Sequence, residues 1–160
     1  MNRYTLAGTL AGVVAVADHL TKLWAIHRLK PPGKPIVVIP DFFDLTYAQN
    51  TGSAFGMFRG FGGMLTLIGV GALIFVAWLL HRHPRARKRS VVALGLILGG
   101  AIGNVTDRML RGYVVDFIDW HIGDKHWPAF NVADAALVAG VIMILIWPEK
   151  VPADAAGPPA

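Results

Sequence analysis

Four aspartates stand inside or beside long apolar stretches of this 160-residue sequence: Asp18, Asp107, Asp116 and Asp134. An ionisable side chain at such a position is costly to bury, so it is a candidate for function. Lys22 follows Asp18 by one helical turn, and we expect these two to form a structural ion pair. Asp107 is followed directly by Arg108, and the same structural interpretation is open for that pair.

Asp116 and Asp134 have no basic residue beside them, which makes them the better candidates for chemistry. Two carboxyl groups that share an apolar site do not both ionise easily, so they hold one proton between them. The ionised group can act as a base on water while the protonated group acts as an acid, as in an aspartic protease. The spacing does not show that the two meet, and a lone aspartate at membrane depth serves ion or proton transfer about as often as catalysis.

The elements that must position these residues are membrane helices. Hydrophobic residues make up 54% of the chain and charged residues only 16%, against about 25% in soluble domains. A small soluble domain has too much surface to carry so little charge, which argues against a cytosolic enzyme, a disordered chain or a nucleic-acid-binding domain. Apolar runs of about 20 residues predict four spans, at about 4–26, 60–80, 90–106 and 130–147.

Two of these spans have features of their own. In the first, Ala15-Val16-Ala17 before Asp18 resembles the cleavage site of a signal peptide. The apolar character continues to Trp24, however, so we expect an uncleaved anchor. The third span is rich in glycine, at positions 99, 100 and 103, where a neighbouring helix could approach closely.

The orientation follows from one basic loop. Five of the 15 Lys and Arg residues lie in residues 81–90, and the rest of the chain holds 10 basic against 10 acidic residues. This loop is expected to be cytoplasmic by the positive-inside rule, so the net charge of +5 reflects topology and not a nucleic-acid partner. Both termini are then cytoplasmic, and segments 27–59 and 107–129 face outward. We expect one integral membrane domain over residues 1–150 and a disordered cytoplasmic tail over 151–160.

The first outward segment carries two β-prone runs, at residues 36–39 and 42–47, which are separated by Pro40-Asp41. We therefore expect a small sheet on the outer membrane surface. The predicted fold is an all-α membrane protein of four transmembrane helices, with a small extracytoplasmic β segment between the first and second helices.

Other kinds of site have less support. The chain has no cysteine, which excludes disulfides, thiolate metal sites and a cysteine nucleophile. The sequence contains no HExxH motif, and we predict no metal and no cofactor. A serine–lysine protease would have to use Ser53 with Lys22, because Ser90 lies on the cytoplasmic side. The alternative from another class is a small proton-linked transporter that uses the intramembrane aspartates, although four spans without an inverted repeat are few for a carrier.

Five blocks of the sequence together resemble the lipoprotein signal peptidase (signal peptidase II) family. In chain order they are DHLTK at 18–22, NTGSAF at 50–55, GGAIGNVTDR at 99–108, GYVVDF at 112–117 and FNVAD at 130–134. One block alone is a weak signal, but five in the family's order are specific. His19 and Ser53 stand where the family more commonly has Gln and Ala, and neither is a presumed catalytic position.

The resemblance implies an intramembrane aspartic endopeptidase of the bacterial cytoplasmic (inner) membrane, with its active site near the outer face. Its substrates would be prolipoproteins that carry diacylglycerol on a cysteine, and it would cut before that cysteine to free the signal peptide. Asp116 and Asp134 would be the catalytic dyad. The residues that line the site or hold substrate and dyad would be Asn50, Gly52, Asn104, Asp107, Arg108 and Asn131. Asp18 and Lys22 would support the bundle beside the site, and we expect a monomer surrounded by membrane lipid.

Overall fold

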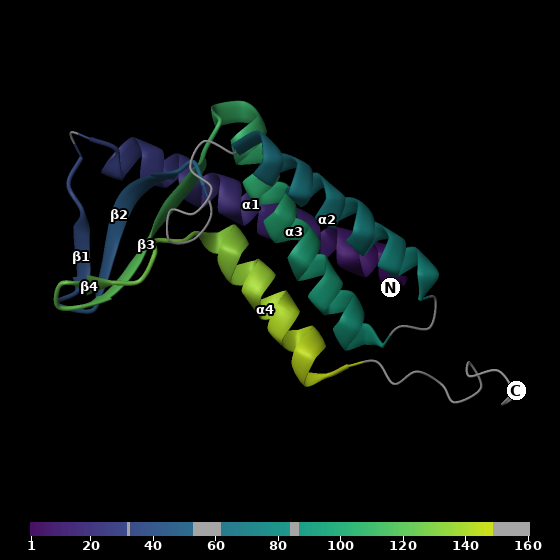
Figure 1. Ribbon diagram of the computed structural model, residues 1–160. Coiled ribbons are helices and arrows are strands. Elements are labelled where there is room, and N and C mark those ends of the chain that lie inside the picture. Colours follow the sequence, from purple (N-terminus) through teal and green to yellow (C-terminus); the bar gives the residue numbers. More distant parts are fainter. Residues whose placement is uncertain (32, 53–61, 84–86, 149–160) are drawn as a thin grey trace, which may run out of the picture.

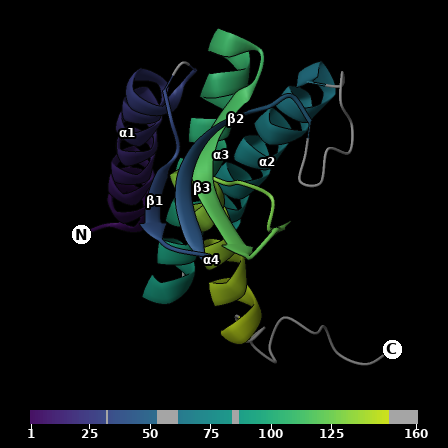
Figure 2. The same ribbon diagram turned by 90° about the vertical axis from the view of Figure 1, so that its left-hand side faces the viewer.

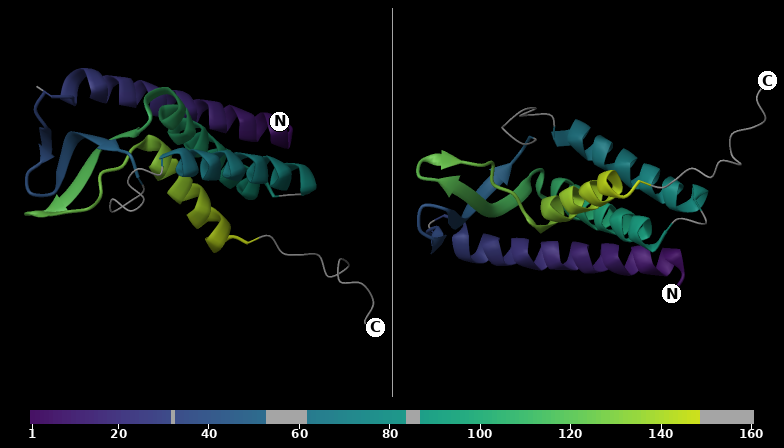
Figure 3. Two further views of the ribbon diagram at one scale, coloured as in Figure 1. Left: turned by 45° about the horizontal axis from the view of Figure 1, so that its top comes forward. Right: turned by 90° about the horizontal axis from the view of Figure 1, so that it is seen from below.

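The computed structural model describes residues 1–31, 33–52, 62–83 and 87–148 (Figure 1). The helices are α1 (Arg3–Leu29), α2 (Gly62–Arg82), α3 (Lys88–Arg111) and α4 (Val132–Ile146). The strands are β1 (Ile36–Ile39), β2 (Phe43–Asn50), β3 (Val114–Ile122) and β4 (Lys125–His126). The helices form a bundle with the sheet at one end, and the N-terminus lies at the other end (Figures 1 and 3). The predicted disordered tail, 151–160, lies outside the described residues.

Helix α3 is the central helix, and it packs extensively against α1, α2 and α4. Its glycines permit close approach, as the sequence predicted. A Cβ atom added to Gly99 would lie 2.9 Å from the carbonyl oxygen of Ala11 in α1. One added to Gly100 would meet the carbonyl oxygen of Ala133 in α4. Backbone therefore packs against backbone on two sides of α3.

Three helices within the described residues are long and apolar enough to cross a membrane: α1, α2 and α3. Helix α4 is apolar but has only 15 residues, fewer than the roughly 20 that a full span needs. A fourth span therefore stays a prediction. The expected end of the third span at Thr106 is too early, because α3 continues to Arg111. It ends at Gly112, whose left-handed backbone (φ 78°) lets its N–H donate to the Arg108 carbonyl.

The sheet is antiparallel and has the strand order β1-β2-β3-β4. The expectation of a sheet built from the first outward segment alone is incomplete, because β3 and β4 come from the second. Strands β2 and β3 pair along most of their length, with Asn50 opposite Val114 and Ala48 opposite Asp116. The sheet lies across the ends of the helices, with α1 on one side and α2 on the other (Figure 2). This pairing brings the end of β2 against the start of β3.

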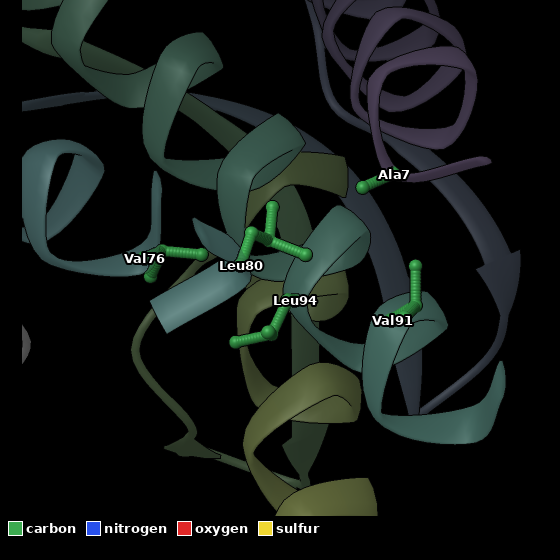
Figure 4. Packing of buried hydrophobic residues seen from close by; sticks show 5 residues of the cluster. All are labelled: Ala7, Val76, Leu80, Val91 and Leu94. Atoms are coloured by element: carbon green, nitrogen blue, oxygen red, sulfur yellow. The ribbon is translucent and has the colours of Figure 1, made fainter. Parts of the chain in front are cut away.

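Two clusters of buried apolar side chains hold these parts together. One joins α1, α2 and α3 far from the sheet and contains Ala7, Val76, Leu80, Val91 and Leu94 (Figure 4). The other joins the C-terminal end of α1 to β3 and contains Ala25, Leu29, Val115 and Phe117. The second cluster fixes the sheet to the bundle, because half of it comes from each.

Candidate active site

Asp116 and Asp134, which are far apart in the sequence, come together at the sheet end of the bundle. Asp116 lies in β3, and Asp134 lies in the first turn of α4. The side-chain amide of Asn131 bonds to both residues. Its Nδ2 donates to Asp116 Oδ1 at 2.6 Å, and its Oδ1 accepts the backbone N–H of Asp134 at 2.9 Å.

Asn131 holds this place because it is the N-cap of α4. Its side chain accepts from Asp134, and the Asp134 carboxylate accepts the N–H of Asn131 in return at 3.3 Å. This reciprocal arrangement is a capping box, which satisfies N–H groups that an α-helix leaves without partners at its start. The same two residues that begin the helix therefore also orient the Asp134 carboxylate.

Asn104 of α3 reaches the site from the other side. Its Nδ2 donates to Asp134 Oδ1 at 2.7 Å, and its Oδ1 accepts from Asn131 Nδ2 at 3.2 Å. The Oδ1 atom also accepts from the Lys22 ammonium at 3.0 Å. Asn104 thus connects one carboxylate of the pair to the cation in α1.

The end of β2 supplies a further donor to Asp116. Asn50 Nδ2 donates to Asp116 Oδ2 at 3.0 Å, and its Oδ1 accepts the backbone N–H of Gly52 at 3.1 Å. The Gly52 carbonyl in turn accepts from Arg108 Nη2 at 3.2 Å. Asn50, Gly52 and Arg108 therefore form one hydrogen-bonded chain that begins at Asp116. Ser53, which the serine–lysine hypothesis would need, lies outside the described residues.

The ion pairs differ in part from those expected. Lys22 pairs with Asp18 at 2.7 Å, which confirms the predicted pair, and it also pairs with Asp107 at 3.1 Å. The alternative pairing of Asp107 with its neighbour Arg108 is wrong, since Asp107 pairs with Arg111 and Lys22. Arg111 was missed by the sequence reasoning, because the predicted helix ended before it. Once α3 includes residue 111, the spacing of four from Asp107 is the signal that finds it.

The electrostatic setting favours an exchangeable proton on Asp116. Burial raises the pKa of Asp116 to about 7, and the negative charge of Asp134 adds to the increase. The hydrogen bonds from Asn50 and Asn131 and the positive charge of Lys22 act in the opposite direction. The cluster contains the carboxyl groups of Asp18, Asp107, Asp116 and Asp134 and three cations, Lys22, Arg108 and Arg111. One proton retained on a carboxyl group therefore makes the cluster neutral.

Within the described ranges, no group of three or more His, Asp or Glu side chains is arranged to hold a metal ion.

His121 and His126 stack at 4.7 Å between ring centroids, beside Asp44 and Asp119. They line a cavity of about 360 Å³ with Phe42, Trp120, Ile122, Lys125 and Trp127. The cavity belongs to the tip of the sheet, whereas the carboxylate pair lies where the sheet meets the helices. The chemistry available to the pair is proton transfer by two carboxyl groups held through amides.

The comparisons with known proteins agree on one family. The sequence profile described as signal peptidase (SPase) II matches residues 10–148. The lipoprotein signal peptidase of Burkholderia thailandensis is 41% identical over 145 residues, which cover 83% of this chain and 81% of that protein. The lipoprotein signal peptidase of Xanthomonas campestris pv. campestris is 41% identical over 142 residues, which cover 86% and 84%.

Two solved structures, both described as bacterial membrane enzymes, are similar to this fold. The first, at 2.3 Å resolution, matches with a TM-score of 0.77 and 32% identity, over 91% of this chain and 94% of that chain. The second, at 1.9 Å, matches with a TM-score of 0.78 and 35% identity, over 88% and 90%.

Proposed function

The chain belongs to the signal peptidase II family, whose peptidases process lipoproteins, and we propose that Asp116 and Asp134 are its catalytic dyad. On this proposal the protein is an intramembrane aspartic endopeptidase. It cuts diacylglyceryl-modified prolipoproteins immediately before the lipidated cysteine and frees the signal peptide. The comparisons do not favour the proton-linked transporter.

The observation that carries the proposal is the Asn131 side chain, which bonds to both residues of the pair. The Asn131 side chain ties the Asp116 carboxylate to the backbone of Asp134, and the Asn131 backbone N–H donates to the Asp134 carboxylate. These bonds fix the two carboxyl groups relative to one another, which a proton relay through one water requires. The pKa of about 7 for Asp116 also supports the proposal, because a catalytic acid or base works best with a pKa near the working pH.

The dyad begins the reaction with one proton. The ionised carboxylate accepts a proton from water as the water oxygen attacks the scissile carbonyl carbon. The protonated carboxyl donates to the carbonyl oxygen, so no full negative charge develops there. When the C–N bond breaks, the departing nitrogen takes a proton from one carboxyl group of the dyad, and the ionised carboxylate takes a proton from a hydroxyl of the tetrahedral intermediate as its carbonyl re-forms. The products are the new carboxyl terminus of the signal peptide and the free amine of the lipidated cysteine. One proton remains on the dyad, which is therefore ready for the next substrate.

The other polar residues of the site are assigned supporting roles. Asn104 and Asn131 orient the Asp134 and Asp116 carboxylates, since each donates directly to one of them. Asn50 and Gly52 place the end of β2 beside Asp116, and Arg108 holds that segment through the Gly52 carbonyl. An extended substrate would lie beside this segment, where peptide carbonyls and amides can find partners.

The depth of the site supports a lipid-bearing substrate. The dyad lies at the sheet end of the bundle, and the basic ends Arg82 of α2 and Lys88 of α3 lie at the opposite end (Figure 3). With that basic end cytoplasmic, the dyad lies near the outer boundary of the membrane, where water is available. Two acyl chains in the outer leaflet would hold the substrate cysteine at this height, so the lipid positions the scissile bond as well as adding affinity.

The test is cleavage of a synthetic prolipoprotein peptide by the purified full-length protein in detergent micelles. A diacylglyceryl-cysteine peptide should be cut immediately before the cysteine, as read by mass spectrometry, and EDTA should not change the rate. The same peptide with an unmodified cysteine should be cut far more slowly. Absence of cleavage, or loss on chelation that zinc restores, would contradict an aspartic peptidase. Equal kcat/KM for the two peptides would remove the role of the lipid.

A further inference from the structure

The residue directly before each dyad aspartate is held by a buried carboxylate. The backbone N–H of Val115 donates to Asp107 Oδ2 at 3.0 Å, and that of Ala133 donates to Asp18 Oδ1 at 2.9 Å. The two carboxylates come from different helices, α3 and α1. Each is 1% exposed, so water does not compete for these bonds.

Both carboxylates bind the same cation. The ammonium of Lys22 lies 2.7 Å from Asp18 Oδ2 and 3.1 Å from Asp107 Oδ2. Its third partner is Asn104 Oδ1 at 3.0 Å, and Asn104 donates directly to the Asp134 carboxylate. Three oxygen atoms therefore surround the Lys22 ammonium, two in ion pairs and one as a hydrogen-bond acceptor.

A structural ion pair between turns of α1 would need only Asp18. The second carboxylate and the amide extend the contact to α3, and through the backbone bonds they reach β3 and α4. Removing one member of a buried ion pair is costly, yet such pairs add little net stability compared with apolar packing. Their best use is to specify one arrangement, and here that arrangement includes the backbone on either side of the dyad.

The packing around Asp18 is tight on the side of α3. A Cβ atom added to Gly103 would contact the Asp18 carboxylate and would lie 3.1 Å from Ala133 Cβ. Glycine at this position lets α1, α3 and the start of α4 meet at one point. We call Lys22, Asp18 and Asp107 the clamp. The α3 backbone at Gly103 limits how far the Asp18 side of the clamp can move.

We propose that Lys22 is the positioning residue of the dyad: from α1 it holds Asp18 and Asp107, which fix the backbone immediately before Asp134 and Asp116. The inference rests on the proposed function, because it takes these two aspartates as the catalytic pair. Among the described residues, Lys22 contacts Asp18, Asp107 and Asn104, which connect it to the dyad, and its positive charge also acts on Asp116 through space. Its loss should therefore change the chemical step and leave substrate binding nearly unchanged.

The experiment compares Lys22→Met with Lys30→Met in the purified full-length protein. Lys30 is the exposed C-cap of the same helix, and among the described residues it bonds to no residue of the site. Lys22→Met should lower kcat for the diacylglyceryl peptide by about 100-fold or more, because small displacements of reacting groups have effects of that size. KM should change less than about threefold, and Lys30→Met should match the wild type.

The pH profile separates positioning from a loss of folded protein. The positive charge of Lys22 lowers the pKa of Asp116, so Lys22→Met should move the alkaline limb of the residual activity to higher pH. A smaller amount of correctly folded enzyme would leave that limb where it is. Wild-type kcat, a change confined to KM, or an unshifted limb would overturn the proposal.

A second variant covers the case in which Lys22→Met does not fold. Asp18→Asn combined with Lys22→Met removes both charges of the closest pair and keeps an oxygen for the Ala133 N–H. This double variant should show the thermal unfolding transition of a folded protein. Its kcat should still fall, because Asp107 loses its ion pair with Lys22. Wild-type kcat in the folded double variant would overturn the proposal. If the wild type itself does not cleave the peptide, that result contradicts the proposed function and is distinct from a failure of the proposed role of Lys22.

Discussion

Asp116 owes its raised pKa to two features of its position. Burial disfavours the charged carboxylate, and Asp134 adds a second negative charge beside it, so the pKa reaches about 7. The amides of Asn50 and Asn131 and the charge of Lys22 favour the carboxylate, and they hold the increase to this value. A carboxyl group with this pKa can hold the shared proton at neutral pH and still release it.

This pKa predicts the direction of the pH dependence. On the proposed mechanism the dyad needs one proton, and Asp116 loses its proton as the pH rises through about 7, so both carboxylates become ionised and the acid is lost. We expect kcat/KM for the lipidated peptide to fall about tenfold per pH unit above pH 7, with an apparent pKa that belongs to the coupled pair. Measurement between pH 5 and 9 checks this. Activity that keeps rising to pH 9 would be incompatible with a shared proton.

The sequence predicted which residues lie around Asp116 and Asp134 better than it predicted the ion pairs beside them. The five blocks contain Asn50, Asn104 and Asn131, which the structure places around the two aspartates. The partner of Asp107 could not be predicted from adjacency, because neighbours on a helix point in directions about 100° apart and residues four apart share a face. Arg111 is therefore the partner, and Arg108 is free to reach Gly52.

At the scale of the elements, hydropathy predicted the helices but not their ends. The predicted third span ends at Thr106, where the charged residues begin, yet α3 continues until Gly112 allows a left-handed turn. Strand β3 is rich in β-branched and aromatic residues, which are signs of a strand. Its pairing with β2 could not be predicted, because it depends on contacts between residues more than 60 positions apart.

The crossing of α3 and α4 gives a prediction at this scale. In Gly100→Ala the new methyl group would meet the backbone oxygen of Ala133, which cannot move without shifting the start of α4 and therefore Asp134. We expect a loss of about 1–3 kcal/mol in the free energy of unfolding, as for other overpacked positions, and lower kcat. Thermal melting and cleavage assays measure both.

The matched control is Gly12→Ala in α1, where the added methyl group meets no atom within 4 Å. Alanine favours helix more than glycine, so this variant should melt at or above the wild-type temperature and keep full activity. If the two variants behave alike, close approach at Gly100 does not hold α4 in place.

For the whole molecule, the charge distribution and the fold agree on one orientation. The end of α2 at Arg82 and the start of α3 at Lys88 lie at the same end of the bundle as the N-terminus (Figure 1). The sheet and the start of α4, which carry the two aspartates, lie at the other end. If the basic residues of 81–90 lie in the cytoplasm, as the positive-inside rule predicts, the proposed dyad lies on the side where exported proteins arrive. On the proposed function, a protease at this end would meet its substrate after export and while the substrate is still in the membrane.

Reporter fusions test that orientation. A reporter fused after His83 should be cytoplasmic, and reporters at Asp41 or Lys125, near the tips of the sheet, should be external. Replacing the five basic residues of 81–90 with Gln should weaken the preference. A cytoplasmic reporter at Asp41 would put the dyad on the wrong side for exported substrates.

The most direct measurement of the central claim is kcat of Asp116→Asn and Asp134→Asn on the diacylglyceryl peptide, with exposed Asp124→Asn as the control. Asparagine keeps the size of the side chain but cannot relay a proton, and acid–base catalysis contributes about 10²–10⁴-fold. Each dyad variant should therefore fall below about one hundredth of the wild-type kcat while it melts as a folded protein, and Asp124→Asn should match the wild type. A folded Asp116→Asn or Asp134→Asn that retains more than about one hundredth of wild-type kcat would contradict the assignment of that residue to the dyad.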